Sequence, residues 1–123
     1  MADLSVTVDD HALTATWTDT NPRTRDAIAD ALPLDGAPTR WGAELYISTP
    51  VDVPPEETQT EVPVGALAYW PQGNALCLFW GETPASRDGE PRAASPVAVV
   101  ATLDDVGPLA GLDGGASLRV DHA

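Results

Sequence analysis

The sequence GALAYWPQGNALCLFWGETP, residues 65–84, carries the strongest structural signal in this chain. Two apolar runs flank a Pro-Gln-Gly-Asn segment, whose residue types are typical of a tight turn. Both runs carry apolar side chains at consecutive positions, whereas a strand with one solvated face would alternate apolar and polar residues. We therefore expect a β-hairpin of residues 62–70 and 75–80, with both of its faces covered.

Further strands and one helix are predicted on either side of this hairpin. Residues 4–8 and 13–17 alternate in polarity around Asp9-Asp10-His11, which predicts an opening hairpin. Asn21 is a helix-capping residue type and Pro22 suits the first helical position, while Pro33 and Gly36 would end that helix. Strands are also expected at 41–48, 96–101 and 117–121, a short helix at 106–112, a turn at 113–115 and polar loops at 52–61 and 81–95. These elements predict one domain, residues 1–123, that is mainly β: a closed β-barrel with one or two short helices.

The charge of the chain is strongly negative. The chain contains nineteen acidic residues and six basic ones, all of them Arg, which gives a net charge of −13. Self-repulsion of this size destabilises a compact fold in dilute buffer, and salt at about 1 M screens it by shortening the Debye length to about 3 Å. We therefore predict a halophilic protein of a salt-rich cytoplasm, as in haloarchaea, with an acidic mesophile protein as the alternative. Nucleic acid and anionic membranes are excluded as partners, because binding phosphate requires clustered Lys and Arg.

No metal or cofactor site is expected. Cys77 is the single cysteine and lies inside an apolar run, which favours a small buried side chain over a nucleophile. His11 and His122 do not form a metal-binding spacing. The N-terminal residues lack the pattern of a signal peptide, and no apolar run reaches the length of a membrane span, so we expect a cytoplasmic protein.

Three segments together resemble the small prokaryotic and archaeal cyclophilin-like family. They are WGAELYISTPV at 41–51, the stretch 65–84, and ASPV at 94–97. The family shares a Trp-Gly-x-Glu-Ile-Tyr-Phe-Ser-Thr-Pro-Val strand and a Gly-Tyr-Trp-Pro-x-Gly-x-Ala-Leu-Cys-Leu-Phe-x-Gly-x-Thr-Pro hairpin. The resemblance implies a cyclophilin-like closed β-barrel with helices at its ends, and it implies no established function.

The resemblance to true cyclophilins lacks their catalytic residues. A cyclophilin prolyl isomerase carries Phe-His-Arg on one strand and a Phe-Met-x-Gln-Gly-Gly run after it, whereas this chain has Leu45-Tyr46-Ile47 and no Gln-Gly-Gly. In cyclophilins the guanidinium is thought to bind the prolyl nitrogen as the amide rotates. This chain has no Arg within the corresponding strand, and Arg40 and Arg87 are the nearby residues that could replace it. We therefore assign no catalytic residue.

The strand at 41–48 predicts a binding groove on the outside of the barrel. Trp41, Ala43, Leu45 and Ile47 would share the inward face, so that Glu44 and Tyr46 point outward. On the partner strand, either Ala75, Cys77 and Phe79 or Leu76, Leu78 and Trp80 would also face out. We predict a groove with a floor of Tyr46, Leu78 and Trp80 and a rim of Glu44, Glu82 and Arg87, and Trp70 is a further candidate. The alternative is that these aromatic residues pack beneath the loops 52–61 or 81–95.

Three functions are compatible with this groove. The leading hypothesis is a binding module for a small molecule or a short X-Pro peptide, because apolar side chains occupy both faces of the sheet. The second is a prolyl isomerase with a degenerate active site. The third is a structural or interaction subunit that buries its outer face in a homodimer.

Overall fold

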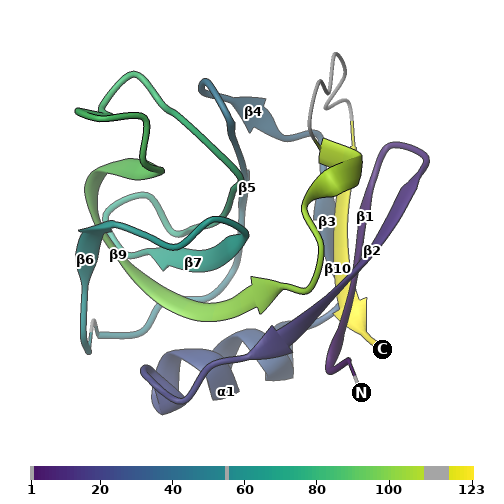
Figure 1. Ribbon diagram of the computed structural model, residues 1–123. Coiled ribbons are helices and arrows are strands. Elements are labelled where there is room, and N and C mark those ends of the chain that lie inside the picture. The colour runs from purple at the N-terminus through teal and green to yellow at the C-terminus, as the bar shows by residue number, and fades with distance from the viewer. Residues whose placement is uncertain (1, 55, 110–116) are drawn as a thin grey trace.

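The computed structural model describes residues 2–54, 56–109 and 117–123, which form ten strands, one α-helix and one 3-10 helix (Figure 1). In chain order these elements are β1 (Leu4–Val8), β2 (His11–Trp17), α1 (Pro22–Ala31), β3 (Leu34–Gly36), β4 (Thr39–Arg40), β5 (Glu44–Ser48), β6 (Gln59–Glu61), β7 (Ala66–Trp70), β8 (Ala75–Phe79), β9 (Arg92–Leu103), η1 (Gly107–Leu109) and β10 (Leu118–His122). The prediction of a mainly β fold is confirmed.

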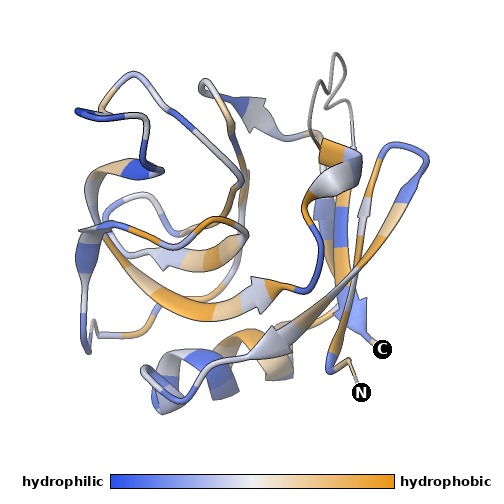
Figure 2. Cartoon of the chain, viewed as in Figure 1, coloured by the Kyte–Doolittle hydropathy of each residue, from blue (hydrophilic) through white to orange (hydrophobic). Residues whose placement is uncertain are grey.

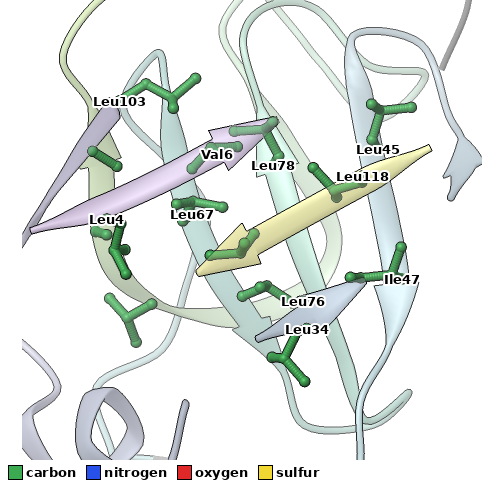
Figure 3. Packing of buried hydrophobic residues seen from close by; sticks show 14 of the residues in the cluster. Leu4, Val6, Leu34, Leu45, Ile47, Leu67, Leu76, Leu78, Leu103 and Leu118 are labelled. Atoms are coloured by element: carbon green, nitrogen blue, oxygen red, sulfur yellow. The ribbon is translucent and has the colours of Figure 1, made fainter. Parts of the chain in front are cut away.

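The strands form one antiparallel sheet that curves around an apolar interior. Its hydrogen-bonded order is β3-β10-β1-β2-β9-β7-β8-β5-β4, and β6 pairs with β9 off this path. Side chains of β1, β3 and β10 point toward those of β5, β7 and β8 (Figure 3). The curvature also brings β3 close to β5, since a Cβ added to Gly36 would lie 3.9 Å from Ile47 Cγ2.

The hairpin of residues 65–84 is buried on both faces, as its sequence predicts. One face belongs to the inner core, a cluster that includes Leu4, Val6, Leu45, Ile47, Leu67, Tyr69, Leu76, Leu78 and Leu118. The other face belongs to a second cluster, here called the outer cluster: Val62, Ala66, Ala68, Cys77, Phe79, Ala93, Val97 and Val99. Hydrophobic colouring is strong on β7 and β9, whereas β6 and the loop before β9 are mostly hydrophilic (Figure 2). The cover of the outer face therefore comes from β9 and the residues next to β6.

Helix α1 begins at Pro22 as expected, but the capping interaction differs from the prediction. The buried Asn21 side chain donates to the Val99 carbonyl (2.9 Å) and accepts from the Glu57 amide (2.8 Å) instead of bonding to α1. The carboxylate of Glu56 takes its place, accepting from the backbone N–H (2.8 Å) and the hydroxyl (2.9 Å) of Thr24. A full negative charge suits the positive end of the helix dipole better than a neutral amide. These hydrogen bonds connect the segment that contains Glu56 and Glu57 to the start of α1.

The remaining differences concern short or irregular elements. Strands β3, β4 and β6 have two or three residues each and were not predicted. Strand β9 begins at Arg92 rather than at Pro96, and its pairing with β6 is irregular between Glu61↔Arg92 and Gln59↔Val97. Pro96 falls within this irregular stretch, where its missing N–H breaks no regular ladder. Of the helix expected at 106–112, the structure describes Val106, which is in no helix, and η1; residues 110–112 lie outside the described residues together with the turn at 113–115.

Candidate functional site

The outer face of the sheet contains a cavity of about 250 Å³. It lies over β5, β8 and the end of β7, beside the first half of β9. Its lining consists of three large aromatic side chains, one carboxyl, one thiol and several small residues: Trp41, Glu44, Tyr46, Trp70, Cys77, Ala93, Ala94, Ser95 and Val97.

Two of these side chains come from β5, where successive side chains point to opposite faces of the sheet. Leu45 and Ile47 enter the inner core, so that Glu44 and Tyr46 project to the opposite face, as predicted from the sequence. In the antiparallel register of β5 and β8, Tyr46 pairs with Cys77. Residues directly opposite each other share a face of the sheet, and this places the Cys77 thiol in the cavity.

Glu44 is the charged group of the cavity, and only 5% of its surface is exposed. Burial raises its pKa from 4.5 to about 7, and a hydrogen bond from Cys77 offsets part of this shift. Burial raises the pKa of the Cys77 thiol well above its ordinary value, and the neighbouring Glu44 raises it further. Cys77 therefore remains a protonated hydrogen-bond donor and is not an activated nucleophile. Near neutral pH the Glu44 carboxyl can either donate or accept a hydrogen bond.

The aromatic side chains of the cavity are held in fixed orientations. The rings of Tyr46 and Trp70 meet edge to face, with centroids 6.0 Å apart and an interplanar angle of 78°. The indole N–H of Trp70 donates to the Ser95 hydroxyl of β9 at 2.6 Å. Both rings are half-buried, so each presents surface to the cavity and to solvent.

Trp41 lines the cavity although the sequence places it on the inward face with Leu45. The prediction is wrong because the strand is interrupted: Gly42 has φ +65° and, with Ala43, forms the turn between β4 and β5. The Trp41 amide donates to the Glu44 carbonyl at 2.9 Å across this turn. Alternation therefore starts at Glu44, and Trp41 joins the outer face. The glycine after Trp41 was the sequence signal that could have indicated this interruption of the strand.

The seven residues predicted for the groove divide into two groups. Glu44, Tyr46 and Trp70 line the cavity. Leu78 belongs to the inner core, because it pairs with Leu45 and so shares its face. Trp80 packs against the same core, and the guanidinium of Arg40 lies 5.5 Å from the centre of its ring.

The other two predicted rim residues, Glu82 and Arg87, do not line the cavity. Glu82 and Arg87 are exposed on the loop before β9, and the Arg87 amide donates to the Glu90 carboxylate at 3.0 Å. Arg40, the other candidate cation, donates through Nε to the Gly42 carbonyl at 3.0 Å. Sequence reasoning missed Trp41 because of the turn at Gly42, and it missed the β9 residues 93–95 because residues 81–95 were expected to form a loop. Val97 was expected in a strand but was not assigned to the groove. It also left the outward set on β8 open, and the structure selects the set that contains Cys77.

Within the described residues, the cavity lining includes no Arg, Lys or His. The same part of the chain contains no group of three or more His, Cys, Asp or Glu side chains that could hold a metal ion. Its helices are all too short or too polar to cross a membrane.

Comparison with known proteins finds a matching family and solved structures of similar fold. The family model described as Cyclophilin-like matches residues 2–121. The solution structure of the hypothetical protein AF2241 from Archaeoglobus fulgidus is similar, with 37% identity and a TM-score of 0.80 over 99% of this chain and 95% of that one. The structure of McbB in complex with tryptophan has a TM-score of 0.73 at 12% identity, which shows a shared fold alone. The match covers 96% of this chain and 44% of McbB. None of the curated proteins matches the chain.

Proposed function

This chain belongs to the cyclophilin-like family, and we propose that it is a binding domain for a small organic molecule, held in the cavity on the outer face of the sheet. One observation carries the proposal: the outer cluster covers most of that face, yet leaves a hollow with aromatic walls and a buried carboxyl. Apolar walls with a few well-placed polar groups are typical of small-molecule sites.

The size of the cavity supports a small ligand over a peptide. An apolar cavity of about 150 Å³ accommodates benzene, so 250 Å³ suits a molecule of about ten non-hydrogen atoms. An extended X-Pro peptide is larger than this. McbB, a protein of similar fold, was solved in complex with tryptophan, a small aromatic molecule. That likeness supports the ligand class at the level of the fold.

The described residues give less support to the other two functions. An isomerase of the cyclophilin type needs a guanidinium beside the prolyl nitrogen, and the described lining supplies none. A dimer through an apolar face needs exposed hydrophobic surface, and within the described residues Val64 is the exposed large hydrophobic side chain. A protease-coupled assay with an Ala-Pro peptide would favour the isomerase if it measured a rate above the uncatalysed one.

We also propose that the sheet closes into a cyclophilin-like β-barrel and that the chain works in a salt-rich cytoplasm. The approach of β3 to β5 and the enclosure of the inner core support closure. The net charge of −13 supports adaptation to salt. Slow amide exchange along the facing edges of β3 and β5 would test closure.

The binding proposal is tested by an NMR shift titration in about 2 M KCl, a concentration chosen to screen the surface charge. The panel consists of cationic, neutral and anionic molecules of about ten non-hydrogen atoms, matched to the cavity volume. We expect saturable shifts at residues that line the cavity. Ala94→Trp, at the exposed edge of the lining, should abolish them. Ala12→Trp, exposed on β2 and outside the lining, is the matched control and should retain them. Shifts elsewhere, or none with any member of the panel, would contradict the proposal.

A further inference from the structure

The polar side chains that line the cavity differ in whether they can carry a charge near neutral pH. Glu44, Tyr46 and Cys77 are the titratable side chains of the described lining, and the thiol already donates to the Glu44 carboxyl. The Ser95 hydroxyl accepts from the Trp70 indole. Glu44 is therefore the group of the lining that is suited to carry a charge near neutral pH, and that charge is negative.

The buried carboxyl has no cationic side chain beside it in the described lining. A carboxylate removed from water is unfavourable unless a positive group or several hydrogen bonds compensate it. Burial accordingly raises the pKa of Glu44 to about 7. A cationic ligand would supply the missing positive charge. An anionic ligand would add a second negative charge in the same enclosure.

The aromatic walls favour the same kind of ligand. A cation is attracted to the electron-rich faces of aromatic rings within about 6 Å, most strongly to those of Trp. Trp41, Tyr46 and Trp70 all line the cavity, and Trp70 is held in place by Ser95 and by its edge-to-face contact with Tyr46. Three rings and one carboxyl thus surround a space suited to a molecule of about ten non-hydrogen atoms.

We propose that the ligand is a small organic ammonium ion, with its nitrogen between the Glu44 carboxylate and the rings of Trp41, Tyr46 and Trp70. This proposal rests on the proposed function, because it names the ligand class of the same cavity. The carboxylate accepts from the ammonium N–H groups or faces a quaternary nitrogen directly, and the rings surround the charged end.

Three molecules of nearly equal size test the charge preference: benzylammonium, benzyl alcohol and benzoate. Affinities are measured by calorimetry at about pH 8, above the pKa of Glu44, in about 2 M KCl. We expect benzylammonium to bind at least about tenfold more tightly than benzyl alcohol, with benzoate weakest. Equal binding of the cation and the alcohol would overturn this inference and leave the proposed function intact. Absence of binding by all three would overturn the inference, and the wider panel described above decides the proposed function separately.

Glu44→Gln separates the charge of the site from its shape. We expect this variant to bind benzylammonium no more tightly than benzyl alcohol, because the carboxylate that pairs with the cation is gone. Retained alcohol binding shows that the cavity has kept its fold. A variant that keeps the full preference for the cation would contradict the role of Glu44.

The pH dependence of wild-type binding gives a second measurement that needs no variant. Because Glu44 must ionise to bind the cation, the affinity for benzylammonium should rise about tenfold between about pH 6 and pH 8. Cys77 and Tyr46 are the other titratable groups in the described lining, and the raised pKa of Cys77 keeps it protonated across this range. The affinity for benzyl alcohol should not rise. A benzylammonium affinity that is flat over this interval would overturn the proposal even if Glu44→Gln failed to fold.

Discussion

Replacing Glu44 by Gln should change how the stability of the ligand-free protein depends on pH. The unfolded chain ionises this carboxyl near pH 4.5, whereas burial in the folded protein raises its pKa to about 7. Below pH 4.5 the carboxyl is neutral in both states and costs nothing in charge burial. As pH rises from 4.5 to 7, the unfolded state loses the proton first, so the folded state is progressively destabilised. Above pH 7 both states are ionised and the loss is complete.

The size of this loss follows from the shift in pKa. Each unit corresponds to about 1.4 kcal/mol, so a rise from 4.5 to about 7 amounts to about 3 kcal/mol. The figure needs little reduction for solvent screening, because Glu44 is 5% exposed. Gln has nearly the same shape and never ionises. The free energy of unfolding of Glu44→Gln, relative to wild type, should therefore increase by about 3 kcal/mol between about pH 4.5 and pH 8.

Urea denaturation in constant KCl across this pH range measures the difference. Taking the variant minus wild type cancels the titration of the other acidic groups, which the two proteins share. Glu82→Gln, on an exposed loop, is the control for removing one negative charge from the surface. A Glu44→Gln difference that stays flat from pH 4.5 to 8, or that runs parallel to the Glu82→Gln difference, would refute the reasoning about burial.

Three further predictions concern stability. The melting temperature should rise steeply between about 0.1 and 2 M KCl, since screening relieves the charge of −13, and an unchanged value in circular dichroism melts would refute adaptation to salt. Glu56→Gln should lower the urea midpoint because it weakens the cap of α1, whereas the control Glu57→Gln, at an exposed neighbouring position, should leave the midpoint unchanged. The hydrogen bond from the Thr24 amide is the main cause that lowers the pKa of Glu56, so the difference between Glu56→Gln and wild type should decrease in acid as this carboxylate is protonated. Gly42→Ala should destabilise the protein by about 2 kcal/mol in the same assay, because φ is +65° and the new methyl would lie 2.9 Å from a carbonyl oxygen. Gly36→Ala, with a nearest contact of 3.9 Å, is its control.

The main elements could be predicted because their signals are local. Polarity alternation marked β1 and β2, and Pro22 marked the start of α1. Strands β3, β4 and β6 are defined by their pairing partners: β3 and β6 pair with distant segments, as Leu34 of β3 does with Val120 of β10, and β4 pairs with the neighbouring β5. Two or three residues cannot display a period, so nothing in their own sequence distinguishes them from a loop.

The site could be predicted only as far as alternation holds. It placed Glu44 and Tyr46 on the outer face correctly, and it failed at Trp41 because Gly42 turns the chain. It could not choose between Cys77 and Leu78, since both are apolar and both runs of the hairpin lack polar residues. The register decides the matter: Leu78 pairs with Leu45, and an inward Leu45 therefore carries Leu78 inward.

Side-chain size alternates along the two strands of the hairpin, and the two faces of the sheet explain this alternation. Polarity does not alternate along β7 and β8, but size does. Their inward side chains are Leu67, Tyr69, Leu76 and Leu78, whereas Ala66, Ala68, Ala75 and Cys77 intervene. Large residues fill the inner core, and small ones leave room on the outer face, which Phe79 and Trp70 limit at one end of each strand. In a run that is apolar throughout, small residues at every second position can therefore indicate the face on which a covering layer packs and a cavity opens. The small residues of this hairpin, which fixes the fold, therefore also leave room for the cavity that Glu44 and the aromatic rings line.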